Sequence, residues 1–114
     1  MKNERRKNYR LRDCLTVVRC PLKYLFDKNY FSKDISEEGM CLFTNSKLEI
    51  GKTLKLGVYL PEEKSPLIIL GKVVRRHVTD DPDQPYLLGI EFVDIEENIK
   101  NKILSHIRFY LQRG

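Results

Sequence analysis

The sequence lacks a long apolar segment, has no tryptophan and contains only three cysteines. No stretch approaches the roughly 20 consecutive apolar residues that a membrane-spanning helix needs. The basic start, Met1 to Lys7, does not lead into the apolar run of a secretory signal. The cysteines form no Cys-x-x-Cys pair, so we expect reduced thiols rather than a disulfide or zinc framework. These absences predict a cytoplasmic protein with no membrane segment and no metal site.

The charge of the chain is unevenly distributed. The chain has 114 residues, of which 32% are charged and 41% hydrophobic, as expected for one folded domain. Residues 1–20 carry seven basic and two acidic side chains, and they therefore hold the whole formal net charge of +5. Such a cationic segment attracts nucleic acid, an acidic membrane surface or a phosphorylated small molecule, although a solvated terminus that aids solubility fits the same pattern.

Short apolar runs predict six strands followed by a helix. The expected strands cover residues 15–19, 24–26, 40–44, 54–60, 67–78 and 86–93. The polar segment 32–39 indicates a loop, and Gly71 favours a bulge or bend within the longest run. Four apolar residues spaced four apart, from Ile99 to Leu111, predict a helix that begins near residue 95 or 98 and ends near 111. Six short antiparallel strands would close into a small barrel or pack as a sandwich, which removes exposed edges.

Two local patterns stand out. Arg6 and Arg10 form an Arg-x-x-x-Arg pattern, and residues 34–39 form an Asp-x-Ser-x-x-Gly pattern that contains Asp34 and Ser36. Taken singly, the first fits a solvated run of charge. The second fits a polar turn in which the two side chains bond nearby backbone N–H groups.

Together, and in this order, the two patterns resemble the PilZ domain family, whose members bind the bacterial messenger cyclic di-GMP (c-di-GMP). The likeness covers about residues 4–111 and includes the runs 71–75 and 88–92 and the closing amphipathic helix. All five motif positions are filled, although Tyr9 stands where many members have proline. The resemblance implies an all-β fold, a six-stranded antiparallel PilZ-like β-barrel with a C-terminal α-helix over residues 13–114. It also implies a flexible basic arm, residues 1–12, that carries the Arg-x-x-x-Arg motif.

The resemblance assigns ligand contacts to the arm. Arg6 and Arg10 would bind the messenger, because the planar guanidinium can pair with a phosphate or with guanine O6 and N7. Arg5 and Lys7 would add positive charge around the phosphates. Binding would order the arm against the barrel and create a surface for an unidentified downstream effector protein.

The resemblance also assigns contacts to the barrel. Asp34 would accept hydrogen bonds from a guanine edge, and Ser36 would donate to a phosphate or bond the loop backbone. Gly39 would let the backbone approach the ligand closely, unless it serves only a positive φ. Arg75 is a further candidate, for stacking on a base, and a solvent-facing arginine is its alternative.

Other functions have less support. We expect no catalytic residues, no cofactor and no enzyme activity, because His77 and His106 have no carboxylate or cysteine at a recognisable catalytic spacing. A small β-barrel that binds nucleic acid is one alternative, although the body of the chain is electrically neutral. A PilZ-like adaptor that no longer binds a ligand is the other, and the five intact motif positions count against it.

Overall fold

The computed structural model describes residues 11–20 and 30–113, which form seven strands and one helix. The strands are β1 (Leu11–Arg12), β2 (Thr16–Cys20), β3 (Tyr30–Ile35), β4 (Gly39–Thr44), β5 (Thr53–Val58), β6 (Leu67–Val78) and β7 (Tyr86–Val93), and the helix is α1 (Glu97–Arg113). Five predicted strands and the predicted helix are confirmed, with small shifts at their ends. The expected strand at residues 24–26 lies outside the described residues, as do Arg5, Arg6, Lys7 and Arg10.

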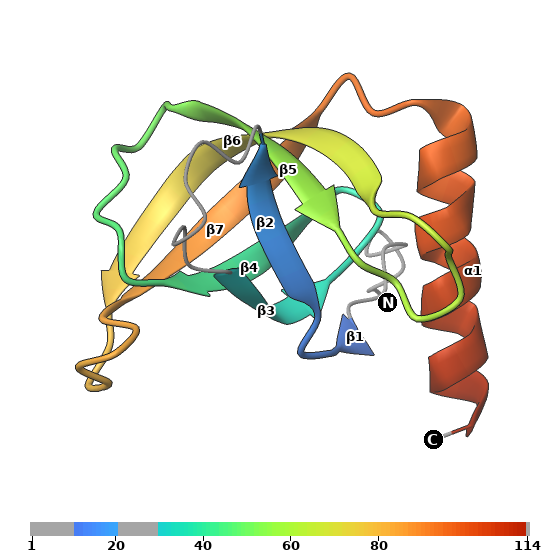
Figure 1. The fold of residues 1–114 in the computed structure, drawn as a ribbon, viewed down its shortest axis with the longest axis horizontal. Helices are drawn as coiled ribbons and strands as arrows, with labels where there is room; N and C mark the ends of the chain where they lie inside the picture. The colour runs from blue at the N-terminus through green and yellow to red at the C-terminus, as the bar shows by residue number, and fades with distance from the viewer. Residues whose placement is uncertain (1–10, 21–29, 114) are drawn as a thin grey trace, which may run out of the picture.

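The strands close into a barrel. The hydrogen-bonded order is β1-β3-β2-β5-β6-β7-β4, and a further pairing of β3 with β4 joins the two ends, so that β2 to β7 form a closed six-stranded ring. Every pairing is antiparallel. Closure pairs both edges of each of these six strands, which the predicted barrel requires. Figure 1 shows the ring with α1 standing beside it.

The core fills the ring and extends under the helix. Alternate residues of β5, such as Leu54 and Leu56, are buried, while Thr53 and Lys55 on the same strand are exposed. The helix adds Ile103 and Ile107 to the same apolar cluster, as their spacing of four predicts. The largest fully buried apolar side chains are Ile35, Met40, Leu42, Leu54, Leu56, Leu88 and Ile103.

Within the described part of the chain, no helix is both long and apolar enough to cross a membrane.

The prediction of a loop over residues 32–39 is wrong for the first half of this segment, because β3 continues to Ile35. Ser32 pairs with Leu42 but Asp34 pairs with Cys41, so β3 has one more residue than β4 at this point. This β-bulge interrupts the alternation of buried and exposed residues. Because its residues are polar and the bulge breaks the alternation, the strand is not recognisable from the sequence pattern.

The bulge expected at Gly71 lies elsewhere on β6. The register with β7 shifts between Val73 and Arg75, whereas Gly71 pairs regularly with Phe92. Gly71 is needed for space, because an added Cβ would lie 2.4 Å from Cγ2 of Ile90 inside the barrel. The small residue therefore reflects core packing, and the bulge is centred three residues later in the chain, at Val74.

The contribution of the helix to the core can be tested with two truncations on α1. Ile103 is 0% exposed, so Ile103→Ala should lower the free energy of unfolding by about 2–5 kcal/mol through lost burial and a residual cavity. Leu111 on the same helix is 44% exposed, and Leu111→Ala should change it by no more than about 0.5 kcal/mol. Urea denaturation of both variants measures the difference. Equal losses would contradict the packing of α1 against the barrel.

Candidate functional site

The first described strand brings the N-terminal part of the chain to the predicted Asp-x-Ser-x-x-Gly segment. Leu11 pairs with Ile35 and Arg12 pairs with Asp34 across β1 and β3. The N–H of Asp13 then donates to the carbonyl of Lys33 at 3.2 Å. Leu11 and Arg12, the last two residues of the expected arm, therefore lie on the sheet beside residues 34–35 of the Asp-x-Ser-x-x-Gly segment. The arm and this segment are the two parts that are predicted to bind the ligand together.

Ser36 holds the turn between β3 and β4. Its N–H donates to the carbonyl of Gly39 at 2.8 Å, and its hydroxyl lies 3.2 Å from the same carbonyl. The hydroxyl also accepts the N–H of Glu38 at 3.3 Å, and the side chain is buried. Of the two roles expected for Ser36, the structure shows the bond to the loop backbone.

Gly39 has a steric role in the barrel wall. An added Cβ would lie 2.1 Å from the carbonyl oxygen of Ile90, a distance that real Cβ atoms do not reach. Among the described glycines only Gly51 has a positive φ, so the left-handed region does not explain Gly39. The close approach of β4 to β7 requires glycine here whether or not a ligand is present.

Two bulges turn charged side chains outward at the same level of the barrel. Tyr30 and Ser32 of β3 point inward, so strict alternation would bury Asp34 as well; on β6, alternation from Leu67 to Val73 would bury Arg75. Each bulge adds one residue just before the charged side chain and reverses its direction. Asp34 is therefore half-buried on the outer face, and Arg75 is exposed there.

These outward residues form one row across five strands. Arg12 is opposite Asp34, Asp34 is opposite Cys41, Cys41 is opposite Gly89, and Gly89 is opposite Arg75. Directly opposed residues of neighbouring strands share a face, and strands lie about 4.8 Å apart. The row therefore places arginines at both ends and a carboxylate between them, over roughly 20 Å of barrel wall measured along the sheet. We call these five residues the outer row.

Arg75 extends across the backbone of Gly89. A methyl group added to Gly89 would lie 3.1 Å from Nη2 and 3.2 Å from Cζ of Arg75. The guanidinium thus occupies the space that a side chain on β7 would otherwise fill. Arg76 differs, because its Nη1 donates to the carbonyl of Leu48 at 3.0 Å and lies 3.7 Å from a carboxylate oxygen of Glu49. Of these two arginines, the structure brings only Arg75 to the outer row.

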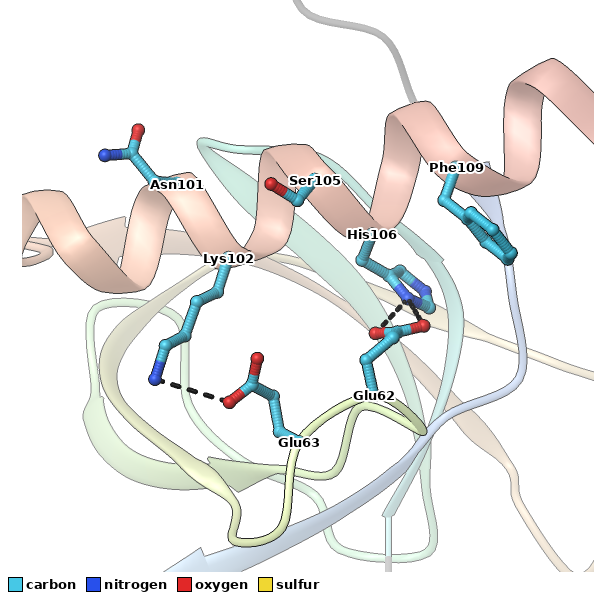
Figure 2. A pocket seen from close by; sticks show the side chains of 7 residues that line it. All are labelled: Glu62, Glu63, Asn101, Lys102, Ser105, His106 and Phe109. Atoms are coloured by element: carbon cyan, nitrogen blue, oxygen red, sulfur yellow. Dashed lines mark hydrogen bonds and ion pairs between the residues drawn. The ribbon is translucent and has the colours of Figure 1, made fainter.

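A second polar cluster was missed by the sequence analysis. The imidazole of His106 is buried, with Nε2 2.6 Å from a carboxylate oxygen of Asp13 and Nδ1 2.8 Å from one of Glu62. Figure 2 shows the contact with Glu62 and, nearby, the ion pair of Lys102 with Glu63. The two carboxylates lie 93 and 44 residues from His106 in the chain, so no local pattern could indicate the cluster.

His106 also borders a surface hollow of about 380 Å³ between α1 and the segment after β5. The lining residues are Glu62, Glu63, Asn101, Lys102, Ser105, His106 and Phe109. Of the predicted site residues that the structure describes, namely Asp34, Ser36, Gly39 and Arg75, none lines this hollow. Within the described ranges, no group of three or more His, Cys, Asp or Glu residues could hold a metal ion.

A closed six-stranded barrel with a C-terminal helix and an Asp-x-Ser-x-x-Gly turn beside the first strand defines a class of small β-barrel domain. The family model described as PilZ domain matches residues 4–109. The chain therefore belongs to the PilZ domain family. A comparison with curated protein sequences finds no match.

Solved structures share the fold at low sequence identity. The Bacillus subtilis inhibitor of motility (MotI/DgrA) superposes with a TM-score of 0.76 at 20% identity and covers 100% of this chain. Escherichia coli YcgR, solved in complex with c-di-GMP, gives 0.69 at 15% identity over 96% of this chain. MrkH, described as a c-di-GMP-dependent transcription regulatory factor, gives 0.71 at 19% identity, also over 96% of this chain. The present chain spans about half the length of each, namely 55%, 46% and 52%.

Glycine substitutions test whether Gly39 is required by the barrel itself. Gly39→Ala forces a Cβ against a backbone carbonyl and should lower the free energy of unfolding by about 3 kcal/mol without any ligand. Gly89→Ala meets a long flexible side chain that can move away, so its cost should stay below about 1 kcal/mol. Thermal or urea unfolding of the ligand-free proteins measures both. A Gly39→Ala protein as stable as the wild type would contradict the steric requirement for glycine in the barrel wall.

Proposed function

We propose that this chain is a c-di-GMP receptor that binds the messenger between its N-terminal segment and the outer row, without catalysis. The observation that carries the proposal is the pairing of β1 with β3, which puts Arg12 opposite Asp34. Membership of the PilZ family supports it. So does the structural likeness to YcgR, whose PilZ domain has been solved with c-di-GMP.

The arginine pair of the motif would reach the ligand because of where β1 lies. Arg10 directly precedes Leu11 in the chain, and Leu11 pairs with Ile35, so we propose that Arg10 reaches the ligand from the start of β1. Arg6 lies four residues earlier in the sequence. In this proposal both guanidinium groups bind phosphate or guanine, while Arg5 and Lys7 add positive charge.

The barrel would supply the other half of the site. Asp34 would accept hydrogen bonds from N1 and N2 of a guanine, and Arg75, exposed at the far end of the outer row, would stack on a base. Ser36 and Gly39 would act indirectly: the first holds the turn through its backbone bonds, and the second allows β4 and β7 to approach. A dianionic messenger would thus meet arginines from both sides of a single carboxylate.

In the proposed mechanism, binding orders the arm across the barrel wall, beginning from Leu11 and Arg12, which already pair with β3. Charge-assisted contacts to the phosphates would offset the entropy lost by the arm. The ordered arm and the outer row would then form a composite surface that a downstream effector protein recognises, which is a disorder-to-order switch.

Arginine substitutions test the assignment of the motif. Arg6→Ala and Arg10→Ala should each lower the affinity for c-di-GMP by about tenfold to a hundredfold per lost charge-assisted hydrogen bond. Arg108→Ala, which removes an exposed arginine from α1, is the matched control and should bind normally. Titration calorimetry gives the affinity and the stoichiometry together. Wild-type affinity in both motif variants would refute the assignment.

Limited proteolysis tests the ordering of the arm. Addition of c-di-GMP should slow cleavage within residues 1–12, because a bound arm is a poorer protease substrate. GMP and cyclic di-AMP at the same concentration should leave the rate unchanged. An identical cleavage rate with and without c-di-GMP would contradict the ordering of the arm. It would not contradict binding of c-di-GMP, which calorimetry tests separately.

Salt dependence separates the receptor from a nucleic-acid-binding barrel. A complex with nucleic acid should weaken steeply as salt is raised, because binding releases many counterions. We expect instead a modest salt dependence for c-di-GMP and no comparable affinity for single-stranded oligonucleotides. Tighter binding of oligonucleotides than of c-di-GMP would favour the alternative function.

A further inference from the structure

His106 joins the C-terminal helix to the residue that directly follows β1. Its side chain is 0% exposed, and its Nε2 lies 2.6 Å from Oδ2 of Asp13. On the other side of the ring, Nδ1 lies 2.9 Å and 2.8 Å from the two carboxylate oxygens of Glu62. A single buried ring thus bridges the turn after β1 and the segment after β5, and Tyr110 packs against it at a centroid distance of 4.7 Å.

The turn that contains Asp13 is held from both ends. The buried hydroxyl of Ser32 donates to the carbonyl of Asp13 and accepts the N–H of Leu15 at 2.8 Å. The N–H of Asp13 donates to Lys33. These bonds fix the backbone where β1 passes into β2, and the carboxylate of Asp13 is the described side-chain link from this turn to α1.

The helix reaches the other side of the candidate site as well. Nζ of Lys100 lies 3.7 Å from a carboxylate oxygen of Glu37, which belongs to the turn between β3 and β4. Both partners of this ion pair are partly exposed, so it should contribute little. The contact of His106 with Asp13 is short, charge-assisted and has a buried imidazole, and contacts of this kind are the stronger ones. Helix α1 is therefore tied to both segments that flank the outer row.

We propose that His106 is a positioning residue for the messenger site and that it couples the site to α1 through Asp13. The contact holds β1 in register with β3, which sets where the chain enters the site. Ordering of the N-terminal segment by the messenger would in turn restrain Asp13 and, through it, the helix. This inference rests on the proposed function, and it adds a route by which binding at the outer row alters the C-terminal helix.

Variants at the described end of this link test the coupling. Asp13→Ala removes the acceptor, and Asp13→Asn keeps a neutral oxygen that can still accept a hydrogen bond from the ring. Glu63→Ala is the matched control, because it breaks an ion pair of α1 with the segment after β5 and leaves Asp13 untouched. For each protein, calorimetry gives the affinity for c-di-GMP, and hydrogen exchange of the α1 amides is measured with and without saturating c-di-GMP.

In the wild type and in Glu63→Ala, c-di-GMP should slow exchange of the α1 amides severalfold. Asp13→Ala should bind about tenfold more weakly and, once saturated, should show no effect of c-di-GMP on α1 exchange. Asp13→Asn should restore only part of both properties, whereas a purely steric role of Asp13 would be restored in full by this residue of the same shape. Because the Asp13 carboxylate is partly exposed, these variants should fold even where His106→Gln does not.

Two results would overturn the coupling. One is a wild-type protein that binds c-di-GMP while α1 exchange stays unchanged. The other is an Asp13→Ala protein whose α1 responds as the wild type does. A wild-type protein that does not bind c-di-GMP in calorimetry would instead overturn the proposed function, and the coupling with it.

Discussion

The candidate site depends on two β-bulges that lie at the same level of one closed barrel. In a closed ring of this size, alternate residues of each strand must enter the core, and a charge there would lose its hydration. Asp34 and Arg75 both occupy positions that strict alternation would bury. One extra residue before each of them reverses the direction of the side chain, so the core stays apolar and the charges share an outer face.

Besides the two bulges, the candidate site depends on the pairing of β1 with β3. β3 offers the same edge to two consecutive strands: Tyr30 and Phe31 pair with β2, while Asp34 and Ile35 pair with β1. The turn between β1 and β2 is held by Ser32 on one side and by His106 on the other. The basic segment therefore joins the barrel next to Asp34, and the C-terminal helix is connected to that junction. The proposed coupling between messenger binding and the helix runs through this one turn.

Much of the fold follows from local periodicity. The alternation from Leu54 to Val58 follows from strand geometry, and the spacing of four residues from Ile99 to Leu111 follows from helix geometry. Strand β5 and helix α1 were predicted from these two patterns. The β3 strand was not, because its bulge breaks the alternation and its residues are polar. The bulge on β6 was predicted at Gly71 because a glycine within a strand indicates either a bulge or a tight packing contact. Only the position of Ile90 in the structure shows that Gly71 makes a tight packing contact.

The sequence by itself determined the cationic N-terminal segment and the two motifs, because each is a property of residues close together in the chain, and the order of the two motifs indicated the family. Only the tertiary structure decided that Arg75 shares a row with Asp34, that Gly39 is required by Ile90, and that His106 lies between Asp13 and Glu62. Each of these facts depends on strand register or on packing between segments far apart in the sequence. Register is set by the whole barrel, since a slip of one residue would turn every side chain of a strand to the opposite face.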